Sequence, residues 1–249
     1  MKLNADQIRD CKAKTLLSIL TAYTNPIAKL LEKAGIPILL VGDTVGMVEM
    51  GFDTTRKVTM DHMVYHVGAV RRGAPNTHVI GDMPYGSDKT AQIALSNALR
   101  LLEAGADSIK IEGPQYKIIE TLVSNNIAVV GHTGLTPQTA VNFKQVGKDT
   151  ADALRITTEA VQLEKAGCFL LVLEHIPAEL AKSITEKVNI PTIGIGAGKY
   201  CDGQVLVIND ALGLGDYWPP FSKQYARLDQ VIEQTVTQFK AEVESGTFP

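Results

Sequence analysis

Short apolar runs that end in an acid or a histidine recur along this chain, and they constrain its fold more than any other feature. A run of four to six apolar residues is typical of a strand buried on both faces, and such strands belong to parallel sheets. A charge at the end of a buried strand is costly and therefore needs a reason. Because parallel strands bring their carboxyl ends to one edge, where α/β enzymes build active sites, the pattern predicts an enzyme. The five runs end at Asp43, Asp82, Glu112, His132 and Glu174.

Strand-like and helix-like segments alternate eight times, which predicts an α/β fold, a (β/α)8 TIM barrel; a doubly wound sheet is the alternative. The length of 249 residues and the lack of a linker favour a single barrel domain, 1–249. Strands are expected at 16–21, 38–42, 78–81, 108–111, 128–131, 169–173, 192–195 and 205–208. Helices are expected at 27–33, 60–72, 90–103, 116–125, 150–165 and 228–244, with a further one starting near Pro177.

Composition excludes several partners. The chain has 24 basic and 27 acidic residues, a net charge of −3, so nothing attracts it to nucleic acid or to a membrane surface. Its three cysteines are unclustered, which argues against disulfides or a zinc site and favours a reducing compartment. Without a signal-like or membrane-spanning segment, a cytoplasmic location is expected.

Three of the acids end neighbouring strands. Asp43, Asp82 and Glu112 follow the second, third and fourth strands, and three carboxylates at one rim repel one another unless a cation lies between them. Oxygen ligands without accompanying Cys or His favour Mg2+ or Mn2+ over Zn2+. The alternative is that each acid caps the following helix or pairs with an arginine.

Three further side chains are candidates for binding and proton transfer. Lys110 lies two residues before Glu112 and so shares its face of the strand. It either neutralises an anionic substrate, attacks a carbonyl as an amine, or forms a salt bridge with Glu112. His132 can donate a hydrogen bond to a carboxylate or exchange protons near neutral pH. Glu174, expected in an apolar environment that raises its pKa, is a candidate general base.

Together these residues predict a metal-dependent enzyme that acts on a small anionic carbonyl compound. A divalent ion held by acids can chelate a 2-oxo acid and acidify the adjacent C–H bond. Glu174 would remove that proton, while Lys110 and His132 would hold the carboxylate and the developing oxyanion.

Several motifs resemble those of the ketopantoate hydroxymethyltransferase (3-methyl-2-oxobutanoate hydroxymethyltransferase) family, from about Thr15 to the end of the chain. They are the segments at 41–47, 70–75, 110–113, 131–138, 173–181, 193–198, 202–204 and 243–249. The resemblance implies a barrel of the phosphoenolpyruvate mutase/isocitrate lyase superfamily type. It also implies transfer of a hydroxymethyl group from 5,10-methylenetetrahydrofolate to 3-methyl-2-oxobutanoate, giving 2-dehydropantoate for pantothenate biosynthesis, and a homo-oligomer, commonly a decamer.

The resemblance also implies roles for individual residues. Mg2+ (or Mn2+) would be bound by Asp43 and Asp82, with Glu112 reaching the ion through water. Glu174 would be the base. The residues that bind the 2-oxo acid would be Asp43, Thr44, Asp82, Lys110 and His132.

Three departures from the family pattern bear on the substrates. Thr44 stands where the family usually has Ser, Phe52 where His or Tyr is common, and the segment 141–148 looks shortened. A paralogue that uses another 2-oxo acid or one-carbon donor is therefore the alternative. Other hypotheses are a superfamily lyase, although its usual Lys-Lys-Cys-Gly-His-type loop is not found; a Schiff-base aldolase using Lys110; and a non-catalytic barrel.

Overall fold

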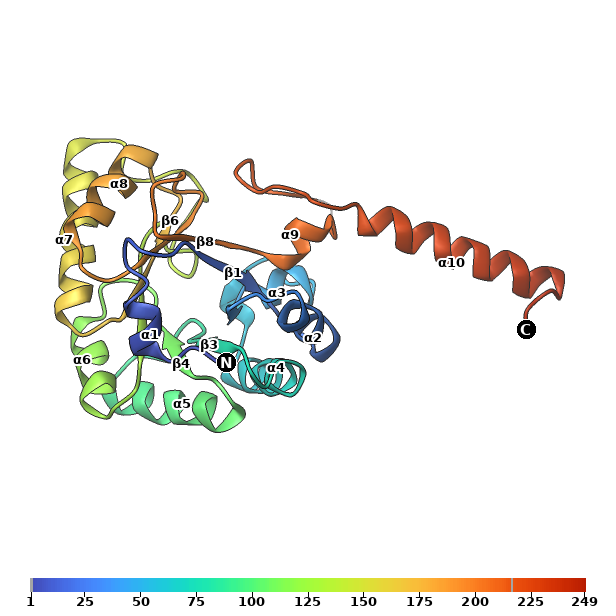
Figure 1. Ribbon diagram of the computed structural model, residues 1–249, viewed down its shortest axis with the longest axis horizontal. Helices are drawn as coiled ribbons and strands as arrows, with labels where there is room; N and C mark the ends of the chain where they lie inside the picture. Colours follow the sequence, from blue (N-terminus) through green and yellow to red (C-terminus); the bar gives the residue numbers. More distant parts are fainter. Residues whose placement is uncertain (1, 216) are drawn as a thin grey trace. The chain divides into compact units, whose positions relative to one another are not determined.

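Eight parallel strands form a closed barrel in the order β1 to β8 (Figure 1). The computed structural model describes residues 2–215 and 217–249. The closed barrel of eight parallel strands confirms the (β/α)8 prediction. The strands are β1 Leu17–Thr21, β2 Ile38–Val41, β3 His78–Asp82, β4 Ser108–Lys110, β5 Val129–Gly134, β6 Leu170–Glu174, β7 Thr192–Ile195 and β8 Gly203–Leu206.

A helix follows most of the strands, and every helix expected from the sequence is present. Three of them begin at a side-chain cap, because Thr59, Thr90 and Asp149 each accept a hydrogen bond from the amide three residues on. The helices are α1 Ala5–Arg9, α2 Asn25–Lys33, α3 Val45–Val48, α4 Met60–Gly73, α5 Ala91–Ala104, α6 Tyr116–Ser124, α7 Thr150–Lys165, α8 Ala178–Lys187, α9 Ile208–Leu212 and α10 Leu228–Ser245, with a 3-10 turn η1 at Thr55–Lys57. None of these described helices is long and apolar enough to cross a membrane.

The chain divides into two compact units, Met1–Val205 and Leu206–Pro249. The first contains seven complete strands and nearly all of β8, together with all of the predicted site residues. The second contains α9 and α10. The prediction of one domain over residues 1–249 stays a prediction; the barrel itself is complete by Leu206.

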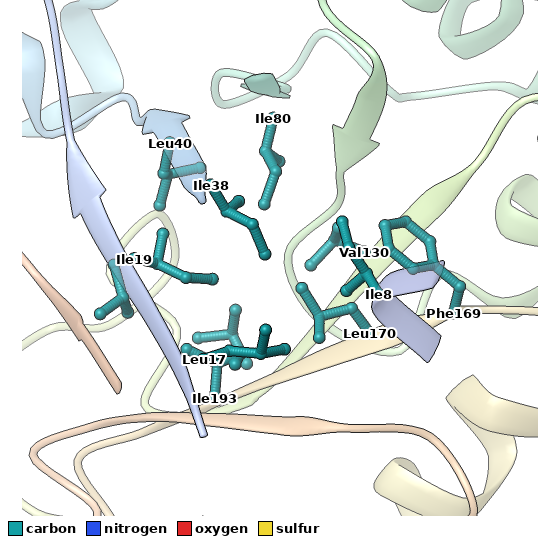
Figure 2. Close-up of a cluster of buried hydrophobic side chains, with 12 residues drawn as sticks. Ile8, Leu17, Ile19, Ile38, Leu40, Ile80, Val130, Phe169, Leu170 and Ile193 are labelled. Atoms are coloured by element: carbon teal, nitrogen blue, oxygen red, sulfur yellow. The ribbon is translucent and has the colours of Figure 1, made fainter. Parts of the chain in front are cut away.

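The barrel interior is filled by apolar side chains from alternate strand positions, as the two-residue period of a strand requires. Ile38, Ile80, Val130 and Leu170 belong to this cluster, and Ile8 from α1 joins them (Figure 2). The same alternation continues along each strand to the polar rim. It places Asp82 two residues beyond Ile80, His132 two beyond Val130, and Glu174 four beyond Leu170.

Two predicted strands have wrong boundaries: the strand expected at 128–131 runs from Val129 to Gly134, and the last strand is displaced. The last strand was expected at 205–208, but β8 runs from Gly203 to Leu206. The reason is a close approach to β1: a side chain on Gly203 would place its Cβ 2.3 Å from the backbone oxygen of Leu17. The strand therefore starts at a residue without a side chain, and the apolar residue Ile208 begins α9 instead.

Candidate active site

Asp82 and Lys110 are brought together by the pairing of β3 with β4. They are register partners at the carboxyl ends of these strands, and the Lys110 Nζ lies 2.9 Å from both carboxylate oxygens of Asp82. Asp43, just beyond the end of β2, donates its backbone N–H to Asp82 Oδ2 at 3.3 Å. The predicted convergence of strand ends therefore holds for these three residues.

This group is buried and carries excess negative charge. Burial, reinforced by the nearby Asp82, raises the pKa of Asp43 to about 7. Burial also raises the pKa of Asp82, although Lys110 opposes the shift. For Lys110, burial would lower the pKa, but the Asp82 and Asp43 carboxylates outweigh it and hold the pKa above its usual range. The lysine is therefore a charged ammonium group paired with Asp82, and not with Glu112, the partner that the sequence suggested.

His132 lies between two carboxylates. Its Nδ1 is 3.5 Å from Glu112 Oε2 and its Nε2 is 3.2 Å from Glu174 Oε2, in ion pairs without good hydrogen-bond alignment. Burial would lower the pKa of His132, but the two carboxylates outweigh burial and raise the pKa to about 9. The imidazolium therefore links Glu174 to the acids at the other side of the rim. The expectation of a purely apolar environment for Glu174 is wrong, because a charged ring contacts it.

Gln138 connects Asp43, in the group with Asp82 and Lys110, to Glu112, in the group with His132 and Glu174. Its role was not predicted from the sequence. Its side-chain Nε2 donates to Asp43 Oδ2 and to the backbone oxygen of Met83, both at 2.9 Å. Its backbone N–H donates to Glu112 Oε1 at 2.9 Å, and Arg56 Nε donates to its carbonyl at 2.7 Å. The only signal for this role was its place four residues after the end of β5, within one of the family-like motifs.

Tyr23 was also missed. It follows β1, is fully buried, and shares a hydrogen bond of 2.7 Å with the hydroxyl of Thr44. Burial raises the pKa of Tyr23, so its phenol keeps its proton and can orient the Thr44 hydroxyl at the rim. A single tyrosine after an apolar strand is usually a core residue, so no sequence pattern assigns it to the site.

The pair Asp43 and Asp82 fits a divalent cation that prefers oxygen ligands. The two carboxylates are buried beside each other, and a cation between them would offset the charge that raises the pKa of both. Within residues 2–215 and 217–249, no group of three or more His, Cys, Asp or Glu side chains is arranged to hold a metal ion. Two carboxylates are enough for Mg2+, which usually retains several waters and binds substrate oxygens as well. The role of Glu112 as a further metal ligand stays a prediction.

Solved structures share the fold of this chain. A 2,3-dimethylmalate lyase, a PEP mutase/isocitrate lyase superfamily member, aligns with a TM-score of 0.64 at 14% identity, over 99% of this chain and 89% of that one. A phosphoenolpyruvate phosphomutase from Streptomyces platensis subsp. rosaceus aligns with a TM-score of 0.66 at 13% identity, over 98% and 88%. At such identity they show the fold alone, a (β/α)8 barrel, which here carries an acidic rim.

Sequence relatives define the family. A 3-methyl-2-oxobutanoate hydroxymethyltransferase of Desulfotalea psychrophila is 50% identical over 94% of this chain and 86% of its own length. One of Pyrococcus furiosus is 43% identical over 100% and 90%. The model of the ketopantoate hydroxymethyltransferase family matches residues 2–249. The chain belongs to the ketopantoate hydroxymethyltransferase family.

Proposed function

We propose that this enzyme transfers a hydroxymethyl group from 5,10-methylenetetrahydrofolate to 3-methyl-2-oxobutanoate, giving 2-dehydropantoate, in a reaction that requires Mg2+ or Mn2+. Family membership supports the acceptor and the reaction class. The observation that carries the chemistry is the rim itself: a buried carboxylate pair lies beside a cation, and Glu174 lies against a protonated histidine.

The first part of the rim binds and polarises the 2-oxo acid. Mg2+ held by Asp43 and Asp82 would polarise the keto group of the acid. The Lys110 ammonium group would attract the negative charge of the acid, and the Thr44 hydroxyl, oriented by Tyr23, would donate a hydrogen bond. A charged lysine paired with Asp82 cannot attack a carbonyl, so this arrangement favours metal-assisted enolisation over an imine at Lys110.

The second part of the rim moves the proton. Glu174 is partly accessible, with 19% of its side chain exposed, and it can accept the proton from C3 of the acid. His132 contacts the Glu174 carboxylate, with its Nε2 3.2 Å from Oε2, and can donate a hydrogen bond to the developing oxyanion. The resulting enolate carbon then forms a bond to the one-carbon unit; a water molecule supplies the oxygen of the new hydroxymethyl group, and tetrahydrofolate is the leaving group.

Proton–deuterium exchange at C3 of 3-methyl-2-oxobutanoate tests this proposal. We expect NMR in D2O to show exchange with enzyme and Mg2+ in the absence of folate, and we expect EDTA to stop it. Glu174→Gln should slow exchange by roughly 100-fold or more, the usual contribution of a positioned base, while Mg2+ affinity stays unchanged. Exchange that survives EDTA, together with borohydride trapping at Lys110, would contradict the mechanism.

The acceptor and the location complete the proposal. A paralogue that acts on another 2-oxo acid or one-carbon donor is the alternative, because Thr44 adds a methyl group to the pocket; comparing exchange rates for 2-oxo acids of different size decides between them.

A cytoplasmic location is part of the same proposal, and it is supported by the three cysteines, Cys11, Cys168 and Cys201, which are all free thiols.

A further inference from the structure

A cavity of about 430 Å³ lies beside the acidic rim. Glu112 and Gln138 belong to its wall, so it opens next to the predicted metal site. The described residues of its wall do not include Lys110, His132 or Glu174. The cavity is therefore adjacent to the acceptor site but separate from it, which is the arrangement that a reaction between two bound substrates requires.

One acid in the wall of the cavity lacks a counter-charge. Glu159 pairs with Arg155 at 2.7 Å and also accepts a hydrogen bond from Thr133. Asp88, by contrast, is half-buried and has no ion pair or hydrogen bond with another side chain in the described part of the chain. Burial raises the pKa of Asp88. Apart from a hydrogen bond with its own backbone, nothing among the described residues offsets the burial of the Asp88 carboxylate, and such burial is costly unless a ligand supplies further hydrogen bonds.

The remaining wall suits a flat ring. Tyr85 contributes an aromatic ring and Pro114 an apolar surface, and Gly86 and Gly113 add wall residues without side chains. A volume of this size lies within the range of about 300–1,000 Å³ that is usual for small-molecule sites. The two oxygens of a carboxylate match two parallel N–H donors, as in a bidentate pair with a guanidinium group.

We propose that this cavity binds the one-carbon donor, and that Asp88 recognises the 2-aminopyrimidine edge of its reduced pterin ring through two N–H groups. The inference rests on the proposed function. The contact discriminates against adenine, which presents an acceptor beside its amino group and would leave one carboxylate oxygen unpaired. The ring is thereby placed with its reactive carbon toward Glu112 and Gln138, facing the acceptor.

The Asp88→Asn variant tests the proposal in the full-length, Mg2+-loaded enzyme. We expect the Kd for tetrahydrofolate, measured by calorimetry, and the KM for 5,10-methylenetetrahydrofolate to rise roughly 10- to 100-fold, the effect of losing hydrogen bonds to a charged group. Exchange at C3 without donor should stay unchanged. Asp53→Asn is the matched control, because Asp53 is an exposed acid paired with Lys57 outside the cavity, and it should alter none of these values.

Ligand discrimination gives a second test that does not depend on how well the variant folds. The wild-type enzyme should prefer 5-formyltetrahydrofolate to its 2-desamino analogue by about tenfold, and Asp88→Asn should lose this preference. Unchanged tetrahydrofolate affinity in the variant, or no preference in the wild type, overturns the proposal. Loss of C3 exchange in the variant also overturns it, because Asp88 would then act on the acceptor. Absence of C3 exchange in the wild-type enzyme would contradict the proposed function, whereas loss of tetrahydrofolate binding in Asp88→Asn would still support the donor site.

Discussion

Among the residues of the rim, Asp43 is the carboxylate with the weakest charge compensation. Lys110 contacts both oxygens of Asp82, whereas the side-chain hydrogen bond to Asp43 comes from the neutral amide of Gln138, and Lys110 acts on Asp43 through its charge without a hydrogen bond. A neutral amide offsets far less of the cost of burying a charge than an ammonium group does. The charge of Asp43 is therefore costly when no cation is present, and a bound cation offsets that cost.

Replacing Asp43 by asparagine should separate these two effects. We expect Asp43→Asn to raise the Tm of the metal-free enzyme at pH 8 by about 3 °C, on a scale of roughly 2–4 °C for each kcal/mol in a chain of this size. Excess Mg2+ at about 100 times its Kd should stabilise the wild type by about 2.7 kcal/mol and leave the variant unchanged. Thermal denaturation with EDTA and with Mg2+ measures both. A metal-free variant less stable than the wild type would show that the Asp43 charge is already compensated.

Gln138 should act as a positioning residue for the metal site. Gln138→Ala removes the donor that holds Asp43 Oδ2 and frees the backbone oxygen of Met83, so the carboxylate can rotate away from Asp82. We expect Mg2+ affinity to fall about 10- to 100-fold, as is usual when a residue that orients a ligand is lost. Calorimetric titration measures it, and Gln92→Ala, on the exposed surface of α5, serves as the control. Equal Mg2+ affinities in the two variants would refute the role.

Whether a residue of the site can be predicted from the sequence depends on whether its side chain is charged. Asp82, Lys110 and His132 could be predicted, because a charged group at the end of an apolar run conflicts with its surroundings. Gln138 and Tyr23 could not: an uncharged amide in a loop and a buried phenol are compatible with purely structural roles. Their contacts with Asp43 and Thr44 depend on how the loops fold over the rim, which one sequence does not specify.

At the scale of elements, β5 and β6 must approach closely for Glu174 to reach His132. Gly134 at the end of β5 is the register partner of Glu174, and its φ of +104° lies in the region that favours glycine. A Cβ at this position would lie 2.3 Å from the backbone oxygen of Glu174. The contact between Glu174 and His132 therefore depends on a glycine in the neighbouring strand.

Gly134→Ala should consequently damage both stability and catalysis. The unfavourable φ alone costs on the order of 1–3 kcal/mol, and the backbone contact must in addition push Glu174 away from His132. We expect a lower Tm and a loss of C3 exchange of at least about tenfold. Gly35→Ala is a matched control, since Gly35 also has a positive φ, +81°, but a side chain there would meet no described atom within 4 Å. It should lose stability and keep its exchange rate; equal exchange rates in the two variants would argue against this account.

The order of the elements was predictable, whereas the way the barrel closes was not. Buried strands of Val, Ile and Leu alternate with capped amphipathic helices, and each of these signals is local. The start of β8 at Gly203 depends on its contact with Leu17 in β1, which is 186 positions earlier in the sequence. Such a long-range steric requirement leaves no local pattern in the sequence. The apolar run at 205–208 therefore predicted the wrong start and end for the last strand.

At the scale of the whole molecule, His78 links the N-terminal segment to the barrel. Its Nδ1 contacts the backbone oxygen of Leu3 and its Nε2 contacts Ser108 Oγ, both at 2.9 Å. Burial lowers the pKa of His78 below its ordinary value of about 6.5. As the pH falls below about 6.5, the unfolded chain therefore takes up a proton at this residue that the folded chain does not, and stability decreases.

The pH dependence of unfolding measures this contribution. We expect the free energy of unfolding to fall more steeply between pH 7 and pH 5 in the wild type than in His78→Gln, which keeps a polar group but cannot titrate. Urea denaturation at both pH values gives the difference, and other titrating groups cancel in the comparison. Parallel pH profiles for the two proteins would mean that His78 does not contribute.

The last helix carries an apolar stripe along one face, which no other described part of its own unit covers. No residue of α10 is buried, although the structure describes the whole helix. The spacing of its exposed apolar side chains follows a helical repeat, which places them on one face. They are Val231, Ile232, Val236, Phe239 and Val243, each between 48% and 58% exposed. Such a stripe is typical of a surface that is covered in an assembly.

We therefore expect a homo-oligomer in which a second copy of the chain covers this stripe, and the family resemblance implies a decamer. Val236→Glu combined with Phe239→Glu introduces two charges into the apolar face, so the assembly should dissociate to smaller species at micromolar concentration. Gln230→Glu combined with Thr237→Glu adds the same charge at exposed polar positions of the same helix and should leave the assembly intact. Sedimentation velocity distinguishes the species. If the wild type sediments as a monomer, or if both double variants keep the wild-type mass, the stripe does not mediate assembly.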